Sequence, residues 1–183
     1  CENLHWIQMS WAGTDIYTAR NGFPREVALT NASGCFHIVI PEYVIAVLLE
    51  LCRNLKTYAV QQQERKWSPI PSEMLLYGKR ALILGAGDIG TGVAERLCAF
   101  GVKIIGMRKT DRNYPDCYDG MITPDELDQE LQKADIVINC LPGTVATKGL
   151  LNKHRLCLMK EKAFLVNVGR GNVIDTEALV SVL

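Results

Sequence analysis

Apolar positions along most of the chain follow two patterns, short runs typical of buried strands and longer segments with helical spacing. The runs predict strands at 80–84, 102–107, 135–140 and 163–168, with a weaker strand at 120–122. The helical spacing predicts helices at about 89–100 and about 147–159, the latter short or broken, and two more that begin at Thr123 and Asp175. Strands that alternate with helices are typical of a Rossmann-type, doubly wound parallel sheet, so we expect an α/β fold.

The first 80 residues follow a different pattern. Two apolar stretches, LHWIQMS and EVALTN, predict the closing βαβ piece of a domain whose beginning is missing. Pro41 then opens a long helix whose apolar side chains recur at helical spacing as far as Tyr58, and the segment KWSPIPSEMLLYGK ends it as a connector. We therefore predict two domains, the C-terminal part of one at 1–40 and a second at 41–183 that is incomplete at its C-terminus.

Charge and cysteine content narrow the class of protein. The 183 residues carry 20 basic and 20 acidic side chains, so no net field favours nucleic acid or an anionic membrane surface. The longest apolar stretch is far too short to span a membrane, and no signal peptide is visible. Seven scattered cysteines without a C-x-x-C pair predict reduced, buried thiols in a cytoplasmic protein, with neither a disulfide framework nor a metal site.

The segment ALILGAGDIGTGVAERL contains the motif G-x-G-x-x-G between a predicted strand and a predicted helix. In that context Gly85 permits a tight turn, Gly87 lets a pyrophosphate approach the backbone, and Gly90 lets helix and strand pack closely. The free N–H groups of the helix start then face the phosphates. The motif therefore predicts a dinucleotide site, although a structural turn in another α/β protein has the same pattern.

The end of the second strand of the sheet predicts which dinucleotide is bound. An acidic residue there would bind the ribose 2′-hydroxyl of NAD, but the sequence reads Gly106-Met107-Arg108-Lys109. Arg108 and Lys109 can instead bind a 2′-phosphate, for which the planar guanidinium is well suited. We therefore predict NADP as the preferred cofactor, with NAD possible; the alternative is a solvated basic pair.

Two further turns follow later strands, where the carboxyl ends of a doubly wound sheet hold ligands. Leu141, Pro142 and Thr147 lie after one strand and are predicted to line the cofactor, although a plain turn explains the proline equally well. Arg170 follows the next strand, between Gly169 and Gly171. An arginine there can bind a carboxylate through two hydrogen bonds and polarise an adjacent carbonyl, or it can be a surface residue in a turn.

The segments GAGDIG, INCLPGTVATKGLL and LVNVGRGNVIDTEAL resemble the D-isomer-specific 2-hydroxyacid dehydrogenase family, as do LHWIQMSWAGTD and NASGCFHIVIPEYVIAVLLELCRNL. The resemblance runs over essentially all 183 residues. It implies a flavodoxin-like substrate domain interrupted by an NAD(P) domain, with the active site in the cleft between them. It further implies hydride transfer between NAD(P)H and a small 2-keto or 2-hydroxy acid, in a homodimer.

The resemblance also assigns roles residue by residue. Arg170 matches the catalytic arginine that binds the substrate carboxylate and ketone oxygen, and Ala12 and Gly13 match the turn whose N–H groups receive the carboxylate. Met107 and Arg108 stand where NAD-preferring members carry an acid, a departure that resembles NADP-using glyoxylate and hydroxypyruvate reductases. The positions that match the cofactor-binding loops are Asp88, Ile89, Leu141, Pro142, Thr147, Val168 and Gly169.

The family's catalytic histidine and its partner glutamate fall after Leu183, and His5, His37 and His154 match neither position. His37 is a candidate hinge residue, and His154 is expected to be exposed on a helix. We therefore expect this chain to be a fragment that binds cofactor without turnover. Its fifth strand is expected to leave an apolar sheet edge that favours self-association.

Two other functions stay open on the sequence. A non-catalytic nucleotide-sensing scaffold related to the family would keep the cofactor fold without the glutamate and histidine. An NAD-using member, such as a phosphoglycerate or formate dehydrogenase, would share the fold and the reaction type. The sequence does not identify which 2-hydroxy acid is the substrate.

Overall fold

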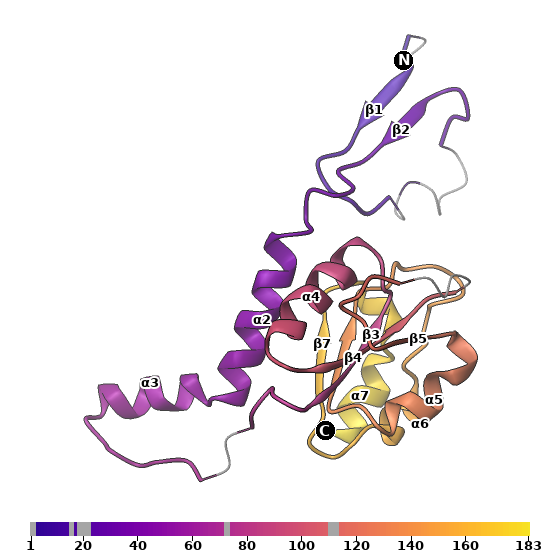
Figure 1. Cartoon of the computed structure of the whole chain (residues 1–183). Helices are drawn as coiled ribbons and strands as arrows, with labels where there is room; N and C mark the ends of the chain where they lie inside the picture. Colours follow the sequence, from indigo (N-terminus) through magenta and orange to yellow (C-terminus); the bar gives the residue numbers. More distant parts are fainter. Residues whose placement is uncertain (1–2, 15–16, 18–22, 72–73, 110–113) are drawn as a thin grey trace.

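The computed structural model describes residues 3–14, 17, 23–71, 74–109 and 114–183. Its centre is a five-stranded parallel sheet in the order β5-β4-β3-β6-β7 (Figure 1). The strands are β3 (Arg80–Leu84), β4 (Lys103–Met107), β5 (Gly120–Ile122), β6 (Ile136–Asn139) and β7 (Phe164–Asn167). The predicted doubly wound α/β fold is confirmed, with strand ends within one residue of those expected.

Helices cover both faces of this sheet, because its strands are apolar on both sides. In β3, Ala81 and Ile83 belong to the core beneath α2 (Val39–Cys52) and α4 (Asp88–Ala99). Leu82 and Leu84 belong to the core on the opposite face, whose helices are α5 (Leu127–Leu131), α6 (Lys153–Leu158) and α7 (Thr176–Val182). Side chains that alternate between two buried faces are typical of a parallel sheet.

Capping side chains mark the helix starts that the sequence predicts at Thr123 and Asp175. Thr123 and Glu126 form a capping box at the short 3₁₀ helix η1 (Pro124–Glu126), which leads into α5. The Asp175 carboxylate accepts a hydrogen bond from the Ala178 N–H at the start of α7. A second 3₁₀ helix, η2 (Gly171–Val173), precedes it. The helix expected at about 147–159 is short, as predicted: it begins after the Asn152 cap.

The N-terminal segment forms a separate two-stranded parallel sheet of β1 (Trp6–Gln8) and β2 (Ala28–Thr30). These strands coincide with the two apolar stretches of the predicted βαβ piece. Most of its expected helix falls outside the described residues, and the domain division after residue 40 stays a prediction. Figure 1 shows the small sheet at one end of α2, which connects it to the large sheet.

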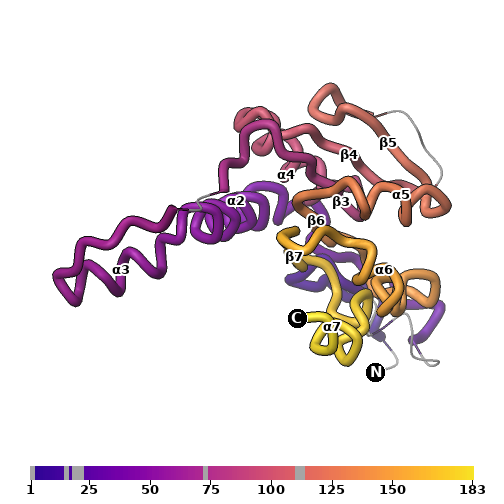
Figure 2. Tube along the Cα trace, turned by 90° about the horizontal axis from the view of Figure 1, so that it is seen from below, coloured from indigo at the N-terminus to yellow at the C-terminus, as the bar shows by residue number. Residues whose placement is uncertain are grey.

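The prediction of a single long helix from Pro41 to the connector that begins at Lys66 is wrong. The structure has two helices, α2 and α3 (Leu55–Gln63), and Pro41 lies within the first turn of α2. Asn54 between them adopts a left-handed conformation with φ of 52°, which stops the first helix and turns the chain. Leu55, which continued the apolar stripe in the sequence, is therefore exposed, and Figure 2 shows α3 projecting away from the rest.

The prediction of buried thiols is correct for one cysteine and wrong for three. Cys52 is buried, whereas Cys35, Cys98 and Cys157 are exposed, and all the cysteines in the described part are free thiols. Cys98 and Cys157 lie in α4 and α6 at positions that face outward, and Cys35 lies in the turn before α2. Among the described residues, no helix is both long and apolar enough to cross a lipid bilayer.

Candidate functional site

The strand order creates a switch point at the carboxyl ends of β3 and β6. The chain runs from β3 outward to β4 and β5 on one side, and then crosses back to β6 and β7 on the other. Open α/β sheets bind ligands beyond the carboxyl ends of the strands at such a switch point. The glycine-rich loop follows β3, and the Leu141–Pro142 segment follows β6.

The glycine-rich loop is fixed by backbone contacts. The N–H groups of Gly85 and Ala86 both donate to the Met107 carbonyl at the end of β4, at 3.2 and 3.1 Å. Gly85 has φ of +93°, and a Cβ atom there would lie 3.1 Å from Leu141 Cδ2. A Cβ atom on Gly90 would overlap the Gly85 carbonyl oxygen. These two glycines are therefore required by the fold itself.

Gly87 differs from its neighbours because it faces open space. It is the N-cap of α4 and has no side chain that could cap the helix. An added Cβ atom at Gly87 would meet nothing within 4 Å. The first N–H groups of α4, including those of Asp88 and Ile89, have no partner within the helix. An exposed helix start with open backbone access fits the pyrophosphate of a dinucleotide.

The basic pair after β4 divides into two environments. Arg108 Nε donates to the Ala86 carbonyl oxygen, so the guanidinium lies across the glycine-rich loop. Lys109 is exposed. The Met107 side chain is buried in the core on the α5 face, so what it offers the loop is its backbone oxygen. The predicted position of a 2′-phosphate site thus holds one anchored cation and one exposed cation.

The loop after β6 is folded by its own hydroxyl groups. Thr147 Oγ1 donates to the Pro142 carbonyl at 2.6 Å and accepts the Thr144 N–H at 2.8 Å. Thr147 therefore holds the loop in shape from within, while Leu141 contacts the glycine-rich loop.

The segment after β7 packs against the same loop. A Cβ atom on Gly169 would lie only 2.6 Å from the Leu141 carbonyl oxygen, so only glycine permits this approach. A Cβ atom on Gly143 would lie 3.2 Å from Arg170 Cγ. The structure thus brings together the loops that follow β3, β6 and β7. These loops carry the predicted residues Gly85, Leu141, Val168, Gly169 and Arg170.

The two predicted substrate-binding residues lie elsewhere. Ala12 and Gly13 are half-buried in the turn after β1 of the small sheet. Asn31 Nδ2 donates to the Ala12 carbonyl at 2.6 Å and fixes this turn to the end of β2. Their N–H groups therefore belong to a rigid turn in a different sheet from the one that carries Arg170.

Two histidines lie close to acidic side chains, and His154 is exposed on a helix as expected. His37, just before α2, has Nδ1 3.2 Å from Asp88 Oδ1 and Nε2 3.6 Å from Glu95 Oε2, so the candidate hinge residue contacts the helix that follows the glycine-rich loop. His154 lies on α6 with its side chain 71% exposed. The described residues contain no cluster of three or more His, Cys, Asp or Glu side chains suited to a metal ion.

Sequence reasoning did not single out two asparagines at this edge of the sheet. Asn139 ends β6 and Asn167 ends β7, and the two are paired in register across the strands. Asn139 is completely buried, the one feature of its strand that apolar patterning does not explain. The available signal was an asparagine in the same place in two otherwise apolar strands, INCLPG and VNVGRG.

Comparison with known proteins agrees with this geometry. The family model of the D-isomer specific 2-hydroxyacid dehydrogenase NAD-binding domain matches residues 45–183. The glyoxylate reductase of Thermofilum pendens is 32% identical over 99% of this chain and 55% of its own length. The chain spans about half the length of the curated relatives it matches.

Solved structures agree as well. A D-isomer specific 2-hydroxyacid dehydrogenase family protein from Aeromonas salmonicida superimposes with a TM-score of 0.93 and 35% identity, over all of this chain and 58% of its own. A D-isomer specific 2-hydroxyacid dehydrogenase from Xanthobacter autotrophicus, in complex with NADPH and MES, gives a TM-score of 0.84 and 28% identity, over 98% of this chain and 56% of its own. The matched family model, the doubly wound sheet and the glycine-rich loop agree, and the chain belongs to the D-isomer specific 2-hydroxyacid dehydrogenase family.

Proposed function

We propose that the complete protein binds NADP in preference to NAD and transfers hydride between that cofactor and a small 2-keto or 2-hydroxy acid. The observation that carries the cofactor preference is the bond from Arg108 Nε to the Ala86 carbonyl. This bond holds a guanidinium beside the glycine-rich loop, at the position where an acidic residue would select NAD. A similar protein from Xanthobacter autotrophicus was solved with NADPH.

The residues at the carboxyl ends of the strands would each bind a different part of the cofactor. The first N–H groups of α4, with the open approach at Gly87, would hold the pyrophosphate. Arg108 and Lys109 would bind the 2′-phosphate, and Leu141, Pro142 and Thr147 would line the nicotinamide half. When bound, the cofactor supplies the hydride.

Arg170 would bind and orient the substrate. Its guanidinium can form two hydrogen bonds to a carboxylate and can stabilise negative charge that develops on the neighbouring ketone oxygen. The turn at Ala12 and Gly13 would add N–H donors to the same carboxylate. The proton on the new hydroxyl group requires a donor, for which the resemblance points to a histidine after Leu183.

A pair of glycine substitutions in this chain tests the cofactor site. Gly87→Ala adds a methyl group to open space, so we expect unfolding free energy within about 0.5 kcal/mol of the wild type. The same methyl group obstructs the pyrophosphate, so NADPH should bind at least about tenfold more weakly.

Gly90→Ala is the matched variant in which the fold, not the cofactor, is affected. Its added methyl group overlaps the Gly85 carbonyl, and overpacking of this kind costs about 1–3 kcal/mol. Calorimetry measures the unfolding free energy of each variant, and fluorescence titration measures its NADPH affinity. Unchanged NADPH affinity in Gly87→Ala would mean that the glycine-rich loop is only a structural turn.

We also propose that the complete protein is a homodimer in which α3 contacts a second copy. The nine residues of α3 include none that are buried, although isolated helices this short are marginal in water. Its apolar side chains Leu55 and Val60 are exposed, and Trp67, in the segment that follows, is 92% exposed. An exposed apolar arm of this kind is typical of an association surface.

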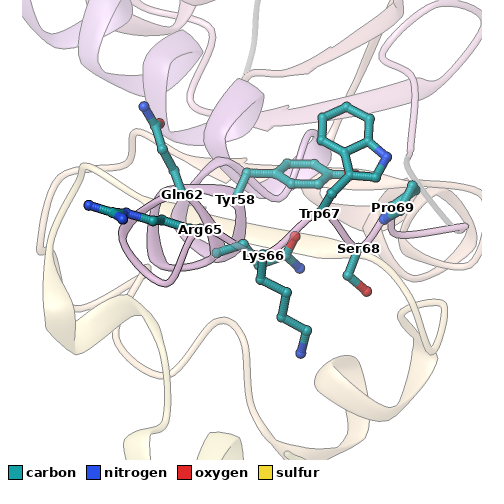
Figure 3. A pocket seen from close by; sticks show the side chains of 8 residues that line it. Tyr58, Gln62, Arg65, Lys66, Trp67, Ser68 and Pro69 are labelled. Carbon is teal, nitrogen blue, oxygen red and sulfur yellow. The ribbon is translucent and has the colours of Figure 1, made fainter.

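The arm also carries a hollow that a partner could fill. Residues of α3 and the segment after it line a space of about 570 Å³ (Figure 3). Tyr58 fixes its shape, because its hydroxyl accepts the Ile70 N–H at 3.1 Å. Sedimentation of the complete protein should give a dimer, and Leu55→Glu should convert it to a monomer. A wild type that sediments as a monomer would contradict the proposal.

The cytoplasm is the compartment we propose. All the cysteines in the described part of the chain are free thiols, three of them exposed, and exposed thiols persist in a reducing environment. Burial raises the pKa of Cys140 to about 12, so this thiol, which follows β6, stays neutral and unreactive.

A further inference from the structure

A completely buried primary amide stands at the edge of the sheet nearest the site. Asn139 is 0% exposed, and the three residues before it in β6 are buried and apolar. A buried amide destabilises a fold unless its donors and acceptors find partners. The hydrogen bonds that Asn139 makes therefore indicate its role.

Asn139 contacts the loops on both sides of it. Its Oδ1 accepts the Leu141 N–H at 3.2 Å, and its Nδ2 donates to Asn167 Oδ1 at 2.9 Å. Asn167 Oδ1 also accepts the Gly169 N–H at 3.1 Å, and Asn167 Nδ2 donates to the Arg170 carbonyl at 3.4 Å. The two amides thus form one chain of hydrogen bonds from Leu141 to Arg170.

The orientation of both amides is set by the backbone. A peptide N–H can only donate, so the Leu141 N–H requires the oxygen of Asn139 and turns its Nδ2 toward Asn167. The Gly169 N–H likewise requires the oxygen of Asn167, which then meets the Asn139 donor. An aspartate at 139 would place two oxygens against each other, and a leucine would make none of these bonds.

We propose that Asn139 and Asn167 are positioning residues that hold Arg170 at a fixed place relative to the Leu141–Pro142 segment. This inference rests on the proposed function, because it assigns Arg170 to the substrate and the Leu141–Pro142 segment to the cofactor. Hydride transfer depends on the distance between the two, and a displacement of about 1 Å can lower the rate about a hundredfold. The amide pair joins the two segments through its own hydrogen bonds.

The test uses the complete protein with a 2-keto acid that the wild type reduces. Asn139→Leu removes the buried amide, and Asn167→Ala removes its partner at an exposed strand end, where a smaller side chain opens no cavity. We expect each to lower kcat between about ten- and a hundredfold, with the Kd of NADPH changed less than about twofold. Ile138→Val, in the same strand, is the control for loosened packing and should leave kcat unchanged.

A double-mutant cycle with Arg170→Ala separates positioning from general damage. A residue that acts through Arg170 has nothing to position once that side chain is gone, so Asn167→Ala should change kcat less than about twofold in the Arg170→Ala background. Equal losses in both backgrounds, or no loss in the wild-type background, would overturn the inference. If the wild type reduces no 2-keto acid, the proposed function fails first and this inference fails with it.

Discussion

The two edges of the large sheet hold charged and polar groups in opposite ways. At the amino ends of the strands, ionic side chains pair with one another: Arg80 Nη2 lies 2.5 Å from Glu130 Oε2, and Lys160 Nζ lies 2.8 Å from Asp135 Oδ1. At the carboxyl ends, polar side chains contact the backbone, as from Arg108 to the Ala86 carbonyl and from Asn167 to the Arg170 carbonyl, and two amides pair with each other. Charges at the first edge are paired with opposite charges, whereas the second edge places cations and N–H groups near the strand ends.

The difference separates stability from function within one sheet. Substitutions at the amino edge should change the free energy of unfolding and leave ligand binding alone. Substitutions of Arg108 and Arg170 at the carboxyl edge should change binding or turnover at nearly constant stability. Each of the following changes is chosen to test that division.

The largest effect is expected for Arg170→Ala in the complete protein. Loss of a charge-assisted contact to the developing oxyanion should lower kcat/KM between about a hundred- and a thousandfold, or about 2.7–4 kcal/mol. Steady-state kinetics with a 2-keto acid measure this loss. Arg170→Lys keeps the positive charge and shows how much of kcat/KM depends on the planar guanidinium. A loss of less than about tenfold would remove Arg170 from the catalytic role.

Glu130→Ala tests the opposite edge. Glu130 is almost fully buried, and removing it leaves the Arg80 guanidinium without its carboxylate, which costs about 3–5 kcal/mol in buried pairs. Urea unfolding of this chain measures the change, with NADPH affinity of the folded protein expected to be unaltered. Lys133→Ala is the matched control, because Lys133 is the half-exposed partner of the same carboxylate, and should cost under about 1 kcal/mol.

Acid should weaken the amino edge selectively. Burial alone would raise the pKa of Glu130, but hydrogen bonds from Lys133 and Arg80 outweigh it and hold the pKa below the usual value of 4.5. The pKa of Asp135 is lowered in the same way by Lys160 and by the Arg80 N–H, against its burial. Groups with lowered pKa values stabilise the fold above their unfolded pKa and lose that contribution as pH falls through the folded pKa.

The unfolding free energy should therefore fall steeply below the ordinary pKa range of carboxyl groups. Glu130→Gln keeps the shape of the side chain without the titration and should flatten this fall. Denaturation at a series of pH values measures the slope. Equal slopes in the variant and the wild type would assign the acid sensitivity to other carboxylates.

The smallest effect is expected for Arg108→Asp, which reverses the charge at the end of β4. The ratio of NADP to NAD affinities should fall about tenfold or more, which corresponds to about 1.4 kcal/mol. Fluorescence titrations with both reduced cofactors measure the ratio, and Lys109→Ala shows what the exposed lysine contributes. An unchanged ratio would mean that the basic pair is only a solvated surface.

The glycine-rich loop at the carboxyl edge of the sheet could be predicted from the sequence. The fold needs Gly85 and Gly90 for backbone reasons, and Gly87 between them faces open space, so the loop was visible from the spacing of its glycines alone. The amide pair was not predictable, because a single asparagine at a strand end is equally common in a turn, and its partner lies 28 residues away. The break between α2 and α3 was missed because the left-handed Asn54 leaves no trace in the apolar periodicity.

The most direct test of the account is a titration of this chain with NADPH and with NADH at one fixed salt concentration. The glycine-rich loop, with Arg108 anchored across it, predicts that both bind and that NADPH binds about tenfold more tightly, a difference of about 1.4 kcal/mol. Equal affinities would contradict the role of Arg108. If neither cofactor bound to the folded chain, the switch point would not be a dinucleotide site.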